Sequence, residues 1–168
     1  MVSSMIKVVP KIIEGRMSVL MIDDDPFNHV MTEGICESFN WNCTPAHTAE
    51  EGMRKALAAD YDIILLDFHL DGKNKGNEVA KVIRDSKLQQ RIYSYSTEEV
   101  ADEEYGGRPL WNGHLDKNNM LTALNTFRED LLRNGFKSPN VEEEEVEIRR
   151  LAPILKKVCY QLCCWNKA

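Results

Sequence analysis

An aspartate follows a short, wholly apolar run in the middle of the sequence. Ile63 to Leu66 are four apolar residues in a row, and Asp67 comes directly after them. A run that short, bounded by turn residues, is typical of a strand that is buried on both faces of a parallel sheet. Aspartate is common in turns. In open α/β sheets, however, ligands bind outside the carboxyl ends of the strands, so Asp67 is a candidate for chemistry.

Polar residues also follow the other predicted strands. Val19 to Ile22 is a second apolar run, and Asp23 and Asp24 come after it. Two later strands are followed by a serine and a lysine. Because parallel strands end at the same edge of a sheet, side chains far apart in sequence are expected to meet in one pocket. These side chains are Asp23, Asp24, Asp67, Ser96 and Lys117.

Such a group of side chains could bind a metal ion and accept a phosphoryl group. Three neighbouring carboxylates repel one another, and a cation between them keeps them ionised at neutral pH. Their hard oxygen ligands favour Mg²⁺, or Mn²⁺, as the cofactor. A carboxylate is also a nucleophile toward phosphorus and forms an aspartyl phosphate. That chemistry needs a metal, a hydroxyl and an ammonium around the phosphoryl oxygens, and Ser96 and Lys117 fit the last two tasks.

The elements that must position these side chains are strands alternating with helices. The pattern of apolar residues predicts strands at 19–22, 41–46, 61–67, 91–96 and 113–116. It predicts helices at 27–39, 48–59, 77–86, 97–105 and 118–133. This alternation indicates parallel β-α-β units with right-handed crossovers, and therefore a three-layer α/β domain.

Residues 18–135 resemble the receiver domain of two-component response regulators. The resemblance rests on Val-Leu-Met-Ile-Asp23-Asp24-Asp25-Pro, Ile-Ile-Leu-Leu-Asp67, Ser96-Thr97 and Leu-Asp-Lys117, in this order. It implies a doubly wound, five-stranded parallel sheet in the flavodoxin-like order 2-1-3-4-5, with helices on both faces. It also implies that Asp67 accepts a phosphoryl group from a histidine kinase or a histidine phosphotransfer protein. The chain would then be a stand-alone signalling protein, not an enzyme, and would act on an unidentified protein target by protein contacts.

The same resemblance assigns the metal ligands. Asp24 and Asp67 would bind Mg²⁺ through their carboxylates, and Asp23 would act largely through metal-bound water. His69 would contribute its backbone carbonyl.

The resemblance also assigns the residues that respond to the phosphoryl group. Ser96 would hydrogen-bond this group and move toward it, and Lys117 would pair with it. His114 occupies the place of an aromatic switch residue, although an exposed polar side chain is an equal alternative. Glu98 stands at a position linked to the rate of dephosphorylation, or simply helps a helix to start.

Three departures from the family pattern concern the pocket. Asn118 follows the lysine where the family usually has a proline, commonly with a cis bond, and a non-proline cis bond costs about 3 kcal/mol. Asp71 stands where the loop after Asp67 usually has a proline. Thr97 replaces a small alanine and narrows the access of a phosphodonor.

Two other functions remain open. Asp23-x-Asp25 after an apolar strand resembles the first motif of haloacid-dehalogenase-type phosphatases, which would make Asp23 the nucleophile of a small Mg²⁺-dependent enzyme. That alternative does not explain Asp67. The chain is also expected to have no room for the cap domain of such phosphatases. The departures at Asn118 and Thr97 favour a third possibility, a receiver-fold scaffold that is not phosphorylated.

Composition excludes some classes of function. The net charge of −6 argues against a nucleic-acid-binding surface. No apolar run approaches the roughly 20 residues of a membrane span, and no secretory signal is visible, so a cytoplasmic protein is expected. The five cysteines have no framework spacing, which favours reduced thiols over disulfides.

The two ends of the chain are set apart from this domain. Residues 1–17 form an N-terminal extension in which Ile13-Glu-Gly-Arg16 matches a protease site used in expression vectors, by design or by chance. Residues 136–168 are predicted to be a linker and an amphipathic helix too short for DNA binding in cis. The apolar residues of this helix have heptad-like spacing. They would pack on the receiver domain or on the same helix of a second chain in a homodimer. A third alternative is that the cysteines of this helix are lipidated. The apolar stripe consists of Ile148, Leu151, Leu155, Val158, Leu162 and Trp165.

Overall fold

Five parallel strands form the central sheet. The structure is a computed structural model that describes residues 16–72, 75–101 and 103–135. The strands are β1 (Ser18–Ile22), β2 (Asn42–Ala46), β3 (Ile63–Leu66), β4 (Ile92–Ser96) and β7 (Gly113–Asp116). Their order is β2-β1-β3-β4-β7, and every neighbouring pair is parallel. The predicted fold class and strand order are confirmed.

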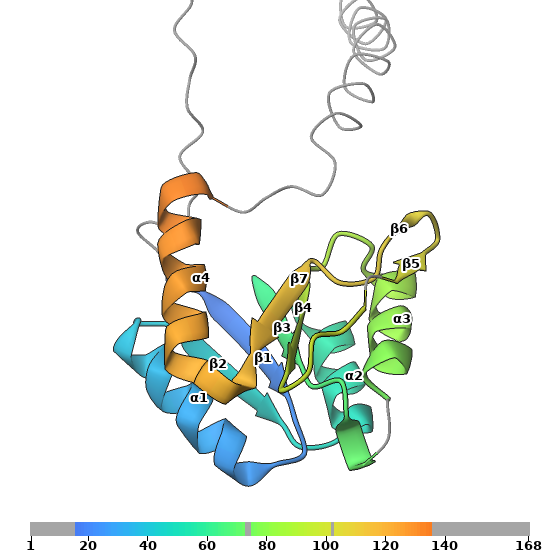
Figure 1. The fold of residues 1–168 in the computed structure, drawn as a ribbon. Coiled ribbons are helices and arrows are strands. Elements are labelled where there is room, and N and C mark those ends of the chain that lie inside the picture. Colours follow the sequence, from blue (N-terminus) through green and yellow to red (C-terminus); the bar gives the residue numbers. More distant parts are fainter. Residues whose placement is uncertain (1–15, 73–74, 102, 136–168) are drawn as a thin grey trace, which may run out of the picture. The chain divides into compact units, whose positions relative to one another are not determined.

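Helices cover both faces of this sheet. The helices α1 (Pro26–Ser38) and α4 (Met120–Asn134) lie on one face, and α2 (Ala49–Ala58) and α3 (Gly76–Ser86) lie on the other (Figure 1). Two 3₁₀ turns, η2 (Leu70–Gly72) and η3 (Lys117–Asn119), follow β3 and β7. All four residues of β3 are fully buried, as expected for a strand covered on both faces. The carboxyl ends of β1, β3, β4 and β7 therefore share one edge of the sheet.

The predicted helix over residues 97–105 is wrong. Residues 97–101 are not helical, and β5 (Glu104–Tyr105) pairs with β6 (Arg108–Pro109) as an antiparallel hairpin. Its two-residue turn is Gly106-Gly107, with φ values of 62° and 76°. Two successive positive φ values suit a tight hairpin turn, and glycine adopts them without strain. The two glycines directly after residue 105 form a hairpin turn and do not mark the end of a helix.

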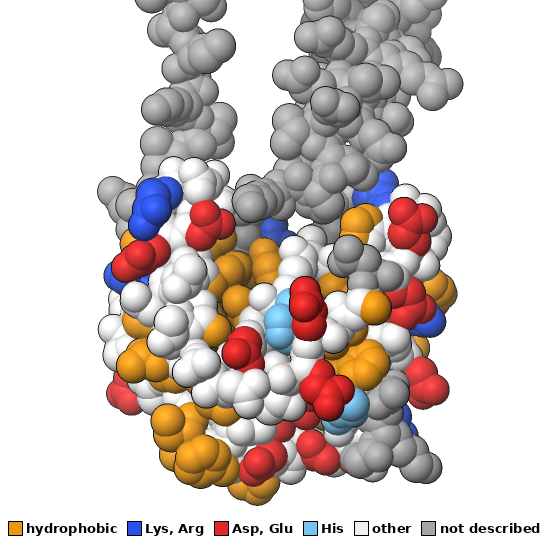
Figure 2. All heavy atoms as spheres, in the orientation of Figure 1, with side chains coloured by type: hydrophobic (Ala, Val, Ile, Leu, Met, Phe, Trp, Pro, Cys, Tyr) orange, Lys and Arg blue, Asp and Glu red, His pale blue; other side chains and the backbone are white. Residues whose placement is uncertain are grey.

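Helix α1 is present where it is predicted, but the apolar side chains of its first two turns face outward. The exposed fractions of Phe27, Val30 and Met31 are 66%, 70% and 42%. The polar His29 and Thr32 face inward and are buried. Figure 2 shows hydrophobic side chains gathered at the lower left, where Figure 1 places the start of α1. Ile35, farther along the helix, is buried, so helical spacing predicted this helix but not that its first apolar residues face solvent.

The ends of the chain lie outside the described residues. The apolar stripe from Ile148 to Trp165 and Cys159, Cys163 and Cys164 all fall there, so their predicted roles stay predictions. None of the helices in the described ranges has the length and the apolar character needed to cross a bilayer.

Candidate functional site

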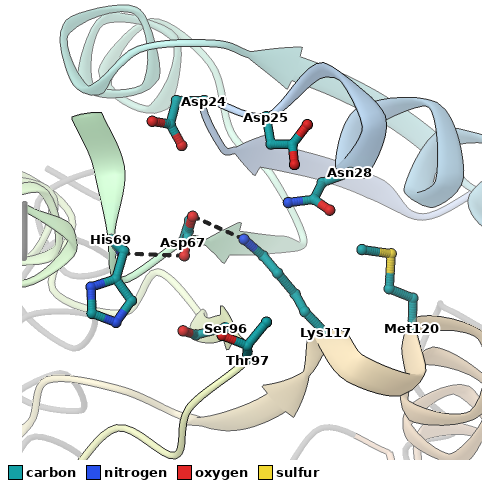
Figure 3. A pocket seen from close by; sticks show the side chains of 9 residues that line it. All are labelled: Asp24, Asp25, Asn28, Asp67, His69, Ser96, Thr97, Lys117 and Met120. Atoms are coloured by element: carbon teal, nitrogen blue, oxygen red, sulfur yellow. Dashed lines mark hydrogen bonds and ion pairs between the residues drawn. The ribbon is translucent and has the colours of Figure 1, made fainter. Parts of the chain in front are cut away.

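The strand ends converge on one pocket, as the sequence predicts. Its volume is about 330 Å³. Carboxylates from the β1 and β3 ends lie opposite a lysine that follows β7 (Figure 3). The pocket is lined by Asp24, Asp25, Asn28, Asp67, His69, Ser96, Thr97, Lys117 and Met120.

Three carboxylates form the acidic cluster of this site. Asp23, Asp24 and Asp67 each offer one oxygen, and these oxygens lie within 4.8 Å of one another. Their exposure differs, because Asp23 is fully buried, Asp67 is 8% exposed and Asp24 is exposed. Only two of the three carboxylates are therefore open to a molecule that arrives from solution.

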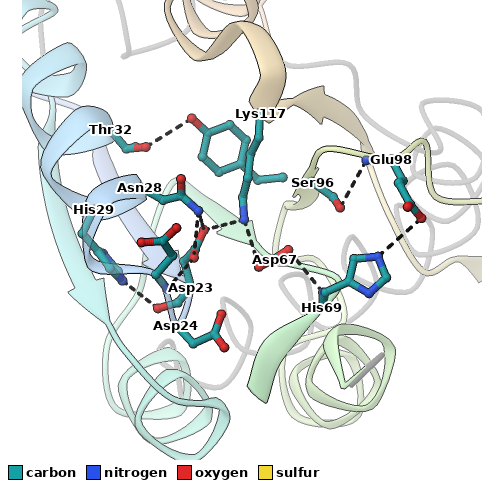
Figure 4. A network of polar contacts seen from close by, with 12 residues as sticks. Asp23, Asp24, Asn28, His29, Thr32, Asp67, His69, Ser96, Glu98 and Lys117 are labelled. Carbon is teal, nitrogen blue, oxygen red and sulfur yellow. Dashed lines mark hydrogen bonds and ion pairs between the residues drawn. The ribbon is translucent and has the colours of Figure 1, made fainter. Parts of the chain in front are cut away.

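Lys117 places a positive charge between two of these carboxylates. Its Nζ lies 2.6 Å from Asp23 Oδ2 and 2.9 Å from Asp67 Oδ2 (Figure 4). The side chain is only 5% exposed. In such a buried position, the attraction between opposite charges is screened much less than at the surface. Without a metal, the ammonium thus balances part of the negative charge of the site.

Both side-chain oxygens of Asp23 are occupied by protein groups. Oδ1 accepts a hydrogen bond from the backbone N–H of Asp25 at 2.9 Å, and the Nδ2 group of Asn28 lies 3.2 Å from both oxygens. Oδ2 also pairs with Lys117. The backbone carbonyl of Asp23 lies 2.7 Å from His29 Nε2. The Asp23 side chain is therefore held in one position at the buried end of the site.

Asp67 and Asp24 are held by backbone donors. The N–H of His69 donates to Asp67 Oδ1 at 3.2 Å, and the N–H of Asp71 donates to Asp24 Oδ2 at 3.0 Å. Asp71 has a φ of 53°, in the left-handed region that a non-glycine residue seldom adopts. The turn after β3 thus reaches back to the end of β1, and each carboxylate keeps a further oxygen lone pair for a ligand.

Ser96 lines the opposite wall of the pocket, and Glu98 lies two residues farther along the chain. Ser96 is 1% exposed, and its Oγ lies 3.5 Å from the backbone N–H of Glu98. The Glu98 carboxylate reaches toward His69, with Oε2 3.5 Å from Nε2 (Figure 4). The backbone carbonyl of His69 as a metal ligand stays a prediction, and so does the role of Glu98 in dephosphorylation.

His114 stands apart from the residues that line the pocket. Its Nδ1 lies 2.9 Å from Ser94 Oγ on the neighbouring strand, and the residue is half-buried. The side chain is thus partly covered, and its role as a switch residue stays a prediction.

Asn118 links the two walls of the pocket. Its backbone N–H donates to Asp116 Oδ1 at 2.8 Å, and its Nδ2 group donates to the carbonyl of Thr97 at 3.0 Å. No peptide bond among the described residues is cis, so the Lys117–Asn118 bond is trans. Lys117 still reaches both carboxylates.

Sequence reasoning missed the amide of Asn28 as part of the site. Asn28 lies three residues after Asp25, which caps α1 by accepting a hydrogen bond from the N–H of Phe27. That spacing places the amide on the first turn of the helix, above the end of β1. The capping aspartate was the signal that could have identified it.

The donor set suits a hard divalent cation. The oxygens come from carboxylates, and the cluster contains neither thiolate nor imidazole nitrogen. Asp24 and Asp67 are the accessible members, so they would hold Mg²⁺ directly, with Asp23 behind them.

Similar proteins agree on one class of domain. No family model matches the sequence. The cell cycle response regulator CtrA of Brucella ovis is 37% identical over 76 residues, which are 45% of this chain and 32% of CtrA. The transcriptional regulatory protein ResD of Bacillus subtilis is 29% identical over 92 residues, which are 55% of this chain and 38% of ResD. The matches thus span about a third of the length of these curated relatives.

Solved structures with the same fold are receiver domains. The receiver domain of the sensor histidine kinase PA1611 from Pseudomonas aeruginosa, with a magnesium ion in its active-site cleft, has a TM-score of 0.59 at 20% identity. It matches 71% of this chain and 100% of that one. The response regulator TrrA from Thermotoga maritima, in complex with Mg²⁺ and BeF, has a TM-score of 0.57 at 22% identity and matches 69% of this chain and 99% of its own. The resemblance predicted from the four motifs is confirmed.

Proposed function

We propose, on the premise that the described residues form a receiver domain of the response-regulator type, that Asp67 accepts a phosphoryl group in a Mg²⁺-dependent reaction. The donor is a phosphohistidine on a histidine kinase or phosphotransfer protein, because receiver domains work with histidine kinases. The phosphorylated domain then signals by binding a partner protein.

The reaction is a transfer between two side chains. A carboxylate oxygen of Asp67 attacks phosphorus, a P–O bond forms and the P–N bond of the phosphohistidine breaks. The imidazole leaves with the electron pair of that bond and takes up a proton. When bound, Mg²⁺ neutralises charge on the transferring oxygens. Lys117 and Ser96 hold the other oxygens by an ion pair and a hydrogen bond.

One observation carries this proposal. Lys117 and the acidic cluster converge on Asp67, which is the cluster member that is both paired with the ammonium and open to the pocket. The same geometry speaks against Asp23 as a phosphatase nucleophile. Asp23 is fully buried, and protein donors occupy both of its side-chain oxygens.

The proposed signalling surface is the segment between β4 and β7. The expected helix after β4 is absent, so the segment between β4 and β7 offers the β5–β6 hairpin to a partner. Asn118 joins the end of β7 to the carbonyl of Thr97. A phosphoryl group that draws Ser96 inward would therefore also pull on the start of this segment.

The test is to find the residue that becomes labelled. The full chain is incubated with acetyl phosphate and Mg²⁺, the acyl phosphate is reduced with borohydride, and the modified residue is located by mass spectrometry. We expect label on Asp67 and none in Asp67→Asn. Asp25→Asn is the matched control, because it changes a carboxylate of the same pocket while asparagine still caps α1. Label on Asp23 would establish the phosphatase alternative, and an unlabelled wild-type chain would establish the scaffold.

A further inference from the structure

Tyr95 lies directly beneath the lysine of the site. It is the next-to-last residue of β4, and its side chain is fully buried. The Nζ of Lys117 lies 5.7 Å from the centroid of the Tyr95 ring. An ammonium within about 6 Å of an aromatic centroid is attracted by the negative face of the ring, and more strongly when water is excluded.

A hydrogen bond from α1 fixes the ring in place. The Tyr95 hydroxyl lies 3.1 Å from Thr32 Oγ, and the dashed line from Thr32 in Figure 4 marks this contact. Thr32 is fully buried on the inner face of α1. Burial raises the pKa of Tyr95, and the hydrogen bond with Thr32 lowers it by a smaller amount, so the phenol stays neutral and keeps its proton for this contact.

The lysine is thus held from two sides. Asp23 and Asp67 contact its ammonium at 2.6 and 2.9 Å, and the Tyr95 ring lies under the same atom. The contact with Asp67 changes when this residue becomes an acyl phosphate, because one of its oxygens is then bonded to phosphorus. The Tyr95 ring does not change charge in that reaction, so its contact with the Lys117 ammonium stays the same.

We infer that Tyr95 is a positioning residue for Lys117: its ring, held by Thr32, keeps the ammonium aimed at the Asp67 oxygens before and after phosphoryl transfer. The catalytic consequence rests on the proposed function. The positioning itself is a property of the protein without its metal.

Tyr95→Leu tests this inference, with Tyr93→Leu as the matched control. Tyr93 lies on the same strand and the same face, but its ring packs on Phe127, 4.8 Å away between centroids. Loss of the ring at position 95 should slow labelling by acetyl phosphate roughly 3- to 30-fold. Tyr95→Phe keeps the ring but loses the hydrogen bond with Thr32, so its rate should lie between those of the wild type and of Tyr95→Leu. Tyr93→Leu should also label at about the wild-type rate, although it too loses a packed aromatic ring.

A second readout does not depend on phosphorylation. In NMR spectra of the chain without metal, the ring current of Tyr95 should shift the signals of the Lys117 side-chain end. That shift should vanish in Tyr95→Leu and persist in Tyr95→Phe. Tyr95→Met, which fills similar space without a ring, serves if the leucine variant does not fold.

The outcomes separate the two ideas. An unlabelled wild-type chain defeats the proposed function, and the NMR comparison still decides the position of the lysine. A wild-type labelling rate in Tyr95→Leu, an equal loss in Tyr93→Leu, or unchanged Lys117 signals would overturn the inference.

Discussion

At the scale of single residues, Lys117 balances the charges of the site. Its ammonium is almost completely buried and contacts both Asp23 and Asp67. A buried charge that loses its partner costs much more free energy than an exposed one, because water cannot replace the lost interaction. The stability of the domain without metal should therefore depend on this side chain.

Lys117→Met should lower the free energy of unfolding by about 3–5 kcal/mol in the absence of divalent cations, because it leaves Asp23 buried without a counter-charge. Addition of Mg²⁺ should restore part of this loss. Urea denaturation with and without Mg²⁺ measures both effects. The control is Lys81→Met, which removes a more exposed ion pair with Glu103 and should change stability far less. Equal losses in the two variants would contradict the central role of Lys117.

Asn118→Ala should destabilise the domain by about 1 kcal/mol, because it removes the side-chain hydrogen bond that joins the β7 end to Thr97. The neighbouring Asn119 makes no capping hydrogen bond with its side chain, so Asn119→Ala is the control. Thermal unfolding of the two variants provides the comparison. If both unfold at the same temperature, the Asn118 link contributes nothing to stability.

The five principal site residues could be predicted from sequence for a physical reason. Ser96 ends a strand, the other four (Asp23, Asp24, Asp67 and Lys117) come shortly after strand ends, and a parallel sheet brings those ends to one edge. The supporting contacts depend on side-chain directions inside the pocket, which local sequence does not encode. The ring of Tyr95 and the link through Asn118 were for that reason found only in the structure.

At the scale of elements, close packing sets the position of α3. Gly76 is the first residue of this helix, and a Cβ atom there would lie 2.5 Å from the carbonyl oxygen of Asp67. Backbone atoms cannot move aside as a flexible side chain can. The absence of a side chain at Gly76 therefore lets α3 begin directly against the backbone of Asp67.

Gly76→Ala should destabilise the domain by about 1–3 kcal/mol and slow labelling of Asp67, because the new methyl group pushes on the backbone of that residue. Gly34 in α1 is the matched control, since a Cβ atom there meets nothing within 4 Å. Gly34→Ala should stabilise the domain by about 0.5–1 kcal/mol through higher helix propensity. Urea titrations give both signs, and a neutral or stabilising Gly76→Ala would refute the close approach.

Arg84 on α3 holds the segment that replaces the expected helix. Its guanidinium donates to the carbonyl of Leu110 at 3.2 and 3.1 Å and to Asn112 Oδ1 at 2.7 Å. The residue is only 5% exposed. Propensity in residues 97–105 could not reveal this anchor, because the partner lies on a distant helix. Arg84 thus holds the end of the segment that leads from the hairpin into β7.

Arg84→Met should increase the rate of amide hydrogen exchange in the β5–β6 hairpin and in residues 110–112, while β1 and β3 keep their protection. The reason is that three hydrogen bonds to this segment are lost and the central strands are not touched. Arg133→Met, at an exposed ion pair with Glu129, is the control and should leave the hairpin unchanged. Uniform acceleration across all strands would indicate global destabilisation instead.

At the scale of the whole molecule, the domain carries more acid than base. The full sequence has a net charge of −6, and three of its carboxylates are concentrated at one edge of the sheet. A cation that binds only the folded state stabilises it in proportion to its affinity and concentration. Binding of the metal and folding of the domain should therefore be coupled.

Mg²⁺ at 100 times its dissociation constant should stabilise the folded chain by about 2.7 kcal/mol. Asp24→Asn removes an accessible ligand and should abolish most of this gain. Thermal unfolding at several Mg²⁺ concentrations measures the effect, and the same series in Na⁺ at matched ionic strength controls for general screening. A melting temperature independent of Mg²⁺ would exclude the acidic cluster as its binding site.

The hydrogen bond from Asp71 to Asp24 couples the η2 turn to the acidic cluster. Asp24 is at once an oxygen donor of the acidic cluster and the acceptor for the N–H of Asp71. An ion that moves this carboxylate toward the pocket must also displace Asp71, the residue with the left-handed backbone conformation. The conformation of this turn should therefore depend on whether an ion is bound in the pocket. A partner protein that contacts only the turn would then distinguish the ion-bound state from the ion-free state.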